Sequence, residues 1–382
     1  MKISFISTLD DYWGGSEPLW VHAAKVMAKE GHDVQVVIYE KDKLHPLLEE
    51  LRKLATSFVL MKSWRVINND SLISRLYYYL KKKANPDFNI KEILKFKGDV
   101  YVLNQPGNYV GCLTPDIHRL LLNIKNKYIL IPHGDFEHVI LRDEERNLAK
   151  VAYKNAQKVC FVSQRNALNV QHQLAMRLAP FKILDYPLNL KTKTYMNFPP
   201  IDDGFHLASV ARFDAQCKGQ DLLFSVLSQQ KWKLRPIRIN LYGTGKDESF
   251  LKELVTYYGL ENKVFFHGHV ANVQNIWKEN HLLVMPSFAE GKPLALAEAM
   301  FCGRPAIVTD VAGNSELIHH QKNGYLISSP TTNLIDEALE LAWNERDKWE
   351  DYGKKAHKFV SDNYDLNPIE TLISIIIKCQ KK

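Results

Sequence analysis

The chain has 382 residues, which is long for one domain and typical of two. Hydrophobic residues make up 46% of it, enough to bury two sizeable cores. The five cysteines form no Cys-x-x-Cys pair, which argues against a structural zinc site and favours a reducing compartment. The first residues have no signal-peptide layout, and no apolar run approaches the roughly 20 residues needed to span a bilayer. We therefore expect a cytoplasmic protein, with peripheral membrane attachment as an open alternative.

Positive charge is concentrated in residues 62–97. This segment holds nine Lys and Arg against three acidic residues, a local charge of +6 in a chain of net charge +7. Such a patch suits an anionic membrane surface, an anionic lipid or an anionic acceptor. A helix expected over residues 70–83 ends in three tyrosines and three lysines, which fits an interfacial helix and equally a solvated basic helix end. Nucleic acid is not an expected partner, because no recognition motif accompanies the charge.

The first half of the chain alternates short apolar runs with helical patterns. This alternation predicts a parallel sheet covered by helices. The expected strands are residues 2–7, 33–39, 57–61, 99–103, 127–131 and 158–162.

A pair of glycines follows the first expected strand. Gly14 and Gly15 lie in a loop that leads into a helix, for which Ser16 is a candidate N-cap. This loop lies at the carboxyl edge of the sheet, where α/β proteins bind ligands. A plain tight turn remains an alternative reading of the two glycines.

Two other strand ends in this half carry polar side chains. The strand ending at Ile131 leads into Pro132 and His133, and the polar segment 104–108 follows another strand. A single histidine at a strand end is more often structural than catalytic, so the residues alone leave the role of His133 open.

Residues 189–204 lose periodicity and gather Pro, Asp and Gly, so we interpret them as a linker. They separate an N-terminal domain, residues 1–188, from a C-terminal domain, residues 205–365. A strongly apolar segment, residues 366–382, follows as a last helix. The second domain restarts the pattern. Its expected strands are residues 205–211, 237–242, 263–270, 282–285 and 305–309.

The most informative stretch is residues 286–317. A buried strand ends at its start, and a helix is expected to begin near Pro293. Glu290 lies in the loop before this helix, and Glu298 lies eight residues later inside it. A glycine-containing loop before a helix N-terminus exposes backbone N–H groups that can hold a hydroxyl-rich or anionic ligand. Two ordinary surface glutamates fit the spacing as well.

The pattern Glu-x7-Glu with Gly-Lys-Pro inside it, followed by Glu-Ala-Met-x-Cys-Gly-x-Pro, closely resembles the donor-binding signature of family 4 retaining glycosyltransferases. The resemblance implies an α/β protein of GT-B architecture. Two Rossmann-like parallel-sheet domains would face each other across a cleft, and the C-terminal helix would cross back to the first domain. Residues 1–188 would form the acceptor-side domain and residues 205–365 the nucleotide-sugar-binding domain. The likeness covers essentially the whole chain, and it is strong over residues 205–327 and weaker before residue 185.

The resemblance also implies roles for individual residues. His133 and Glu290 are the expected catalytic residues at the donor sugar. The guanidinium of an arginine and the ammonium of a lysine are expected to compensate the negative charge of the donor diphosphate. The glycine loop is expected to lie beside the same diphosphate. The expected diphosphate-binding residues are Gly14, Gly15, Arg212 and Lys218. The expected sugar-binding residues are Glu290, Gly291, Lys292, Pro293 and Leu294. Glu298 is expected to bind the ribose, and the nucleobase is expected to lie beside Gly243, His267, His269 and Val270.

No Asp-x-Asp triplet and no His/Cys cluster with metal-ligand spacing occurs in the sequence. We therefore expect no metal and no cofactor. The charge on the leaving nucleotide would instead be met by Arg212, Lys218 and helix N-termini. A two-carboxylate glycosidase is disfavoured, because its acids must flank one bond, whereas Glu290 and Glu298 fall on opposite parts of a nucleotide-sugar.

The expected function is transfer of a sugar from a nucleotide-diphosphate sugar, UDP- or GDP-linked, with retention of anomeric configuration. The acceptor would be a glycan, a lipid-linked molecule or another acceptor. The reaction would belong to bacterial-type surface polysaccharide or glycoconjugate synthesis. Two alternatives are a nucleotide-sugar epimerase of similar fold and a non-catalytic protein that binds nucleotide-sugars.

Overall fold

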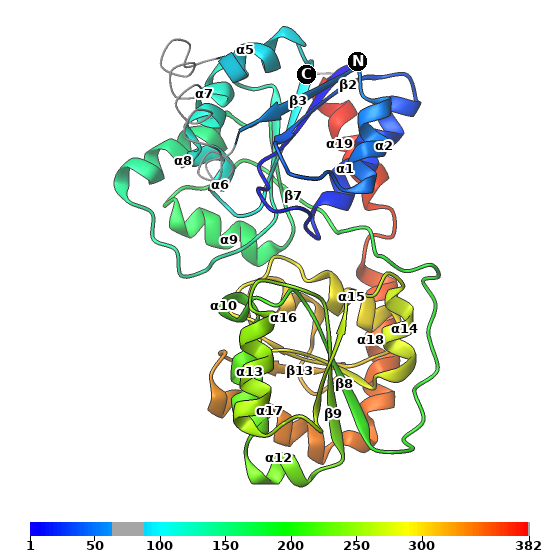
Figure 1. Ribbon diagram of the computed structural model, residues 1–382. Coiled ribbons are helices and arrows are strands. Elements are labelled where there is room, and N and C mark those ends of the chain that lie inside the picture. The colour runs from blue at the N-terminus through cyan, green and yellow to red at the C-terminus, as the bar shows by residue number, and fades with distance from the viewer. Residues whose placement is uncertain (63–87, 381–382) are drawn as a thin grey trace. The chain divides into compact units, whose positions relative to one another are not determined.

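The computed structural model describes residues 1–62 and 88–380, with Phe88 described by its backbone only. The predicted helix 70–83, and with it most of the basic segment 62–97, lies outside the described residues. The chain forms two compact units (Figure 1). The first unit contains Met1–Pro187 and Asp365–Lys382, and the second contains Leu188–Tyr364.

A seven-stranded parallel sheet forms the centre of the first unit, in the order β3-β2-β1-β4-β5-β6-β7. Its central strands are apolar on both faces, because helices cover both faces. The strands are β1 (Lys2–Ser7), β2 (Asp33–Tyr39), β3 (Ser57–Met61), β4 (Val100–Gln105), β5 (Tyr128–Pro132), β6 (Lys158–Phe161) and β7 (Lys182–Ile183).

Helices pack on both faces of this sheet (Figure 1). On one face lie α1 (Glu17–Lys29), α2 (Pro46–Leu54) and α19 (Pro368–Gln380), and α19 packs directly on α1. The last helix of the chain therefore belongs to the first unit. The other face is covered by α5 (Phe88–Lys95), α6 (Val110–Leu113), α7 (Pro115–Asn123), α8 (Asp143–Asn155) and α9 (Gln164–Gln173).

The second unit is built around a six-stranded parallel sheet in the order β10-β9-β8-β11-β12-β13. The strands are β8 (Phe205–Val210), β9 (Ile237–Tyr242), β10 (Val264–Gly268), β11 (Leu282–Met285), β12 (Ala306–Thr309) and β13 (Tyr325–Ile327). One face carries α11 (Gln220–Leu227), α12 (Gln230–Leu234), α13 (Glu248–Tyr258) and α17 (Thr332–Asn344). The other carries α14 (Val273–Glu279), α15 (Leu294–Phe301) and α18 (Trp349–Asn363). The short helices are α10 (Ala215–Lys218), α16 (Asn314–Leu317) and the 3-10 turn η1 (Arg346–Lys348).

Both sheets share one winding pattern. In each, the first strand of the unit has the second on one side and the fourth on the other, which is the doubly wound Rossmann order. The prediction of two Rossmann-like parallel-sheet domains is thereby confirmed. Ligands of such sheets bind outside the carboxyl ends of the strands where the order reverses, between β1 and β4 and between β8 and β11.

Some local predictions were wrong. The short edge strands β7 and β13 were not predicted, because two or three residues carry too little periodicity. Ser16 stands at the N-cap position of α1, but its side chain makes no capping hydrogen bond. Its backbone is already helical, with φ −80° and ψ −25°, rather than in the extended conformation typical of a side-chain cap.

A buried arginine holds the segment that was expected to be a linker. Arg304 is fully buried, and its guanidinium donates to carbonyl oxygens of Met196 at 3.0 Å and Asn197 at 2.7 Å. The same group donates to the carbonyls of Trp277 and Asn280, next to β11. Residues 189–204 therefore lie within the second unit, and Arg304 is one of the side chains that hold them there.

Replacing this arginine should destabilise the second unit strongly. In Arg304→Met, several buried carbonyl groups lose their donors, so we expect a loss of about 3 kcal/mol or more in unfolding free energy. Arg238→Met is the matched control, because Arg238 is half exposed and its contacts, with Asp203 and with the ring of Phe265, lie at the surface. Denaturant unfolding of both variants measures the difference, and equal losses would contradict the role given to Arg304.

Candidate functional site

The loops after β8 and β11 meet at the carboxyl edge of the second sheet. Lys218 ends α10, and its Nζ lies 2.6 Å from Oε1 of Glu290, which follows β11. The hydroxyl of Ser287 donates to the same oxygen at 2.8 Å. Gly219 has a φ of 65°, and a Cβ there would stand 2.3 Å from the carbonyl oxygen of Pro286, so glycine is required for this close approach.

The Lys218–Glu290 ion pair is largely shielded from water, with side chains 16% and 8% exposed. The family resemblance implies separate roles for these two residues, Lys218 at the diphosphate and Glu290 at the sugar. The structure brings their charged groups into contact. A ligand that carries phosphate and hydroxyl groups together would meet both of them at this point.

The segment Gly291–Leu294 leads from this ion pair into α15. The backbone N–H of Gly313 donates to the carbonyl of Gly291 at 2.9 Å, and Lys292 lies 5.3 Å from the ring centre of Tyr364. Pro293 stands at the N-cap position of α15, which no side chain caps. The first N–H groups of α15 are therefore available to an anionic or hydroxyl-rich ligand.

Glu298 lies inside α15 and is buried, with 3% of its surface exposed. Its Oε1 accepts a hydrogen bond from the backbone N–H of Asn189 at 2.8 Å. Burial raises the pKa of Glu298 to about 7, and this one hydrogen bond only partly opposes the shift. The reading of Glu298 as a surface glutamate is therefore wrong, whereas its role at a ribose stays a prediction.

The expected nucleobase-side residues lie at the ends of the neighbouring strands β9 and β10. Gly243 has a φ of 140°, and a Cβ there would stand 2.1 Å from the carbonyl oxygen of Ala211. His267 stacks on Tyr242 with 4.7 Å between ring centres, and its Nε2 lies 3.0 Å from Oδ1 of Asn240.

The other residues of this unit that are expected to bind the sugar donor also lie at the carboxyl edge of the sheet. Arg212, just after β8, and His269, just after β10, are exposed, and Val270 packs partly against the core. The structure thus gathers these residues at the carboxyl edge of one sheet, and their individual roles stay predictions.

His133 follows β5 in the first unit and is buried, with 6% exposed. Its Nε2 lies 3.2 Å from Oδ1 of Asn104, and its Nδ1 lies 3.0 Å from the hydroxyl of Tyr186. The amide nitrogen of Asn104 faces the carbonyl of Ile6, so the amide oxygen faces the ring. This arrangement assigns the ring proton to Nε2 and makes Nδ1 an acceptor.

Burial lowers the pKa of His133 to about 3. The imidazole is therefore neutral at neutral pH, and Asn104 and Tyr186 hold both of its nitrogens. This geometry suits a group that orients a ligand better than one that exchanges protons. The catalytic role expected from the resemblance stays a prediction. Tyr186 was missed, because it is far from His133 along the chain.

The glycine pair after β1 is not required by backbone strain. Neither Gly14 nor Gly15 has a positive φ. A Cβ on Gly15 would meet no atom within 4 Å, and one on Gly14 would meet the side chain of Leu9 at 3.2 Å. Open space therefore lies beside Gly15 alone, at the carboxyl edge of the first sheet, and the plain tight turn remains an alternative reading of the pair.

A buried glutamate directly behind the glycine pair was missed by the sequence analysis. Glu17 is 3% exposed, and the hydroxyl of Ser7 lies 3.2 Å from each of its carboxyl oxygens. Burial raises its pKa to about 7. The sequence signal that could have identified Glu17 is its place as an acidic residue in the first turn of the helix that follows the two glycines.

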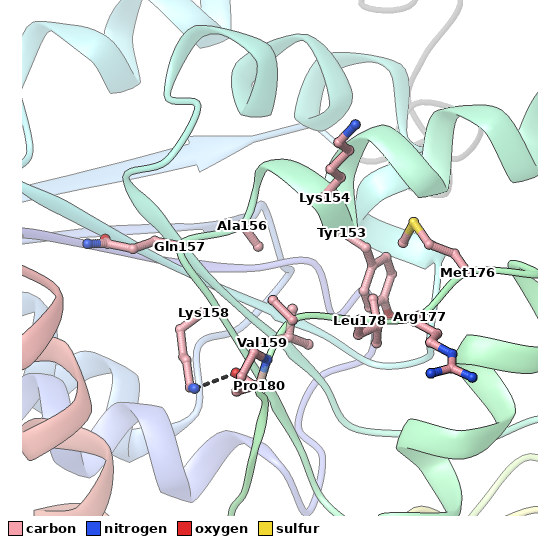
Figure 2. Close-up of a pocket in the computed structure, with 11 residues that line it drawn as sticks. Tyr153, Lys154, Ala156, Gln157, Lys158, Val159, Met176, Arg177, Leu178 and Pro180 are labelled. Atoms are coloured by element: carbon pink, nitrogen blue, oxygen red, sulfur yellow. Dashed lines mark hydrogen bonds between the residues drawn. The ribbon is translucent and has the colours of Figure 1, made fainter.

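A pocket of about 300 Å³ lies at the opposite, amino-terminal edge of the first sheet, between the loops before β6 and before β7 (Figure 2). Lys154, Lys158 and Arg177 line it, but Figure 2 shows their charged groups pointing in different directions. Lys158 donates to the carbonyl of Pro180. None of the predicted site residues lines this pocket.

Within residues 1–62 and 88–380, the structure has no group of three or more His, Cys, Asp or Glu residues that could hold a metal ion. In the same residues, no helix is long and apolar enough to cross a membrane.

Residues 192–359 match the family model described as "Glycosyl transferases group 1". An uncharacterized glycosyltransferase of Haemophilus influenzae is 24% identical over 96% of this chain and 97% of its own length. The chain is a glycosyltransferase, and its second unit carries the group 1 glycosyltransferase domain. This agrees with the resemblance to family 4 transferases, and these comparisons give the epimerase alternative no support.

Two other relatives of this glycosyltransferase are informative. Poly(ribitol-phosphate) alpha-N-acetylglucosaminyltransferase of Staphylococcus aureus is 30% identical over 39% of this chain, a match that spans only 30% of the relative. The crystal structure of HepE from Anabaena in complex with UDP-glucose matches with a TM-score of 0.74 and 18% identity, over 99% of each chain. The latter likeness shows the fold.

Glu298→Gln should make the glycosyltransferase more stable at neutral pH. The folded state holds the proton of Glu298 up to about pH 7, whereas an ordinary glutamate loses it near 4.5. Between these values the folded state binds more protons, so the contribution of Glu298 to stability falls as the pH rises. At pH 7.5 we expect Glu298→Gln to gain about 3 kcal/mol over wild type, and at pH 4 almost nothing.

The control for this experiment is Glu337→Gln, because Glu337 is exposed on α17. The stability of each variant is measured by thermal unfolding at a series of pH values from 4 to 8. A gain that does not grow with pH, or an equal gain in the control, would contradict a buried, protonated Glu298.

Proposed function

We propose that this glycosyltransferase takes its sugar from a UDP-sugar and transfers it, with retention of configuration, to a hydroxyl of a carbohydrate acceptor. The observation that carries the proposal is the shielded Lys218–Glu290 contact beside the uncapped start of α15. It places a cation, a carboxylate and free N–H groups on one edge of the second sheet. These are the groups that a diphosphate joined to a sugar requires.

In this proposal Arg212 and Lys218 compensate the charge of the diphosphate. The ammonium of Lys218 turns from Glu290 to a phosphate oxygen when the donor binds. Glu290 is then released to accept hydrogen bonds from sugar hydroxyls, together with the N–H groups at the start of α15. Glu298 accepts from the ribose hydroxyls, which favours its ionised form in the complex.

The chemical step is proposed to be driven by charge stabilisation on the leaving nucleotide. Positive charge fixed at the diphosphate lowers the free energy of the bond-breaking transition state, because the negative charge develops there. His133 is neutral and takes no proton in this scheme. The residues named here perform the step without a metal ion.

The proposals for the acceptor and for the location of the protein rest on one relative and on the charge of one segment. The S. aureus relative is named for a poly(ribitol-phosphate) acceptor, which favours a surface-glycopolymer acceptor, glycan or lipid-linked, for this chain as well. We propose a cytoplasmic protein that attaches to an anionic membrane through the basic segment 62–97. UDP is preferred to GDP because HepE was crystallised with UDP-glucose.

Donor binding is tested by thermal shift with a panel of UDP- and GDP-sugars. A ligand that binds the native state raises the unfolding midpoint by mass action. We expect one UDP-sugar to stabilise wild type, and Arg212→Ala to bind it roughly 10- to 100-fold more weakly, the loss of one charged contact.

Arg346→Ala is the matched control, because Arg346 is an exposed arginine of the same unit that lies against Trp343. It should keep the full thermal shift. Stabilisation by no nucleotide-sugar, or an equal loss in both variants, would contradict the proposed donor site.

A further inference from the structure

Two aromatic rings lie on the loop between β1 and α1, next to the glycine pair. Tyr12 is 48% exposed, and Trp13 stacks on His45 with 3.8 Å between ring centres and 11° between ring planes. Tyr12 lies 5.8 Å from the same histidine ring. Burial lowers the pKa of His45, so its ring is uncharged at neutral pH. The loop therefore presents aromatic rings beside two acidic residues, Asp10 and Asp11, at the carboxyl edge of the first sheet.

This loop is held in place by the first unit. The Nζ of Lys41, just after β2, donates to the carbonyl oxygens of Leu9, at 3.0 Å, and of Asp11. The backbone N–H of Leu9 donates to Ser7 Oγ at 3.3 Å, and Ser7 in turn donates to Glu17. Because these contacts fix the loop in advance, a ligand that binds there does not have to order it.

A carboxylate oxygen on the same loop has no partner. Oδ1 of Asp10 is buried and accepts no hydrogen bond from any described residue. A buried acceptor without a donor costs free energy unless a ligand supplies the donor. On the same loop, a Cβ added to Gly15 would meet no atom within 4 Å, so there is open space at this position.

We propose that Asp10, Tyr12 and Trp13 form the subsite that binds a neutral sugar unit of the acceptor. A pyranose ring has an apolar C–H face, which packs on aromatic rings, and hydroxyl groups at its edge, which donate to a carboxylate. The subsite rests on the proposed function, because it names what that transferase accepts.

The charges of the loop select a neutral sugar over a phosphate group. Asp10, Asp11 and Glu17 are the acidic side chains around the subsite, and Lys41 is the nearby cation. The ammonium of Lys41 is already used by two backbone carbonyls of the loop. A phosphate at this point would be repelled by Asp10, while the ammonium of Lys41 is engaged with the loop backbone.

The experiment is saturation-transfer NMR of wild type with a panel of methyl glycosides of glucose, galactose, N-acetylglucosamine, mannose and rhamnose. We expect one glycoside to receive saturation at its ring-face protons. The signal should fall about tenfold in Trp13→Ala and in Asp10→Asn, because each loses one of the two sugar contacts. Tyr12→Ala, an exposed position, tests the same surface if Trp13→Ala fails to fold.

The matched control is Tyr257→Ala, which removes an aromatic ring that is 78% exposed on α13. Its glycoside signal should equal that of wild type. Binding of no glycoside, unchanged binding in Asp10→Asn and in the aromatic variants, or stronger binding of glycerol 3-phosphate than of any glycoside would overturn the subsite.

The donor thermal shift, measured on the same samples, separates this proposal from the proposed function. We expect Trp13→Ala and Asp10→Asn to keep the full shift by the UDP-sugar. A wild type that binds a UDP-sugar but no glycoside overturns the acceptor subsite alone. A wild type that binds no nucleotide-sugar overturns the proposed function, and with it the subsite as part of a transferase.

Discussion

The contact between Lys218 and Glu290 is the constraint on which the donor site depends. It exists because β8 and β11 are neighbours at the point where the sheet order reverses, so their following loops must meet. Gly219 allows the two loops to approach each other, because any side chain at this position would collide with the backbone of Pro286. The helix that starts four residues after Glu290 then directs its free N–H groups to the same place.

Buried ionisable groups give the two units a common property. Glu17 in the first unit and Glu298 in the second both have a pKa raised to about 7 by burial, and His133 has a pKa lowered to about 3. All three shifts favour the uncharged form. These side chains belong to the edges at which ligands of doubly wound sheets bind, where desolvated groups strengthen hydrogen bonds to a ligand.

Much of the fold could be predicted from the sequence. The central strands are continuous apolar runs because helices cover both sheet faces, and β1, β2, β9 and β11 were predicted with their observed bounds. The glutamate pair of the donor loop was found because its spacing and its glycine belong to one local motif. The edge strands β7 and β13 were not predicted, because their pairing with a longer neighbouring strand defines them more than their own residues do.

The partners of the site residues could not be predicted, because they are distant along the chain. Tyr186 reaches His133 from 53 residues away, and the backbone of Asn189 reaches Glu298 from 109 residues away. Arg304 gives no hint in the sequence that it holds residues 196 and 197. Such contacts depend on how the sheets bring loops together, which periodicity and local motifs do not contain.

The most direct test of the account compares the affinity of UDP with that of the stabilising UDP-sugar, by calorimetry, in wild type, Glu290→Gln and Lys218→Met. If Glu290 binds the sugar and Lys218 the diphosphate, Glu290→Gln should bind UDP at least as well as wild type, because Lys218 is freed from its ion pair. It should lose the additional affinity for the UDP-sugar, whereas Lys218→Met should bind both ligands about tenfold or more weakly. An equal loss of both ligands in Glu290→Gln would contradict the separate roles that the account gives to the two halves of this contact.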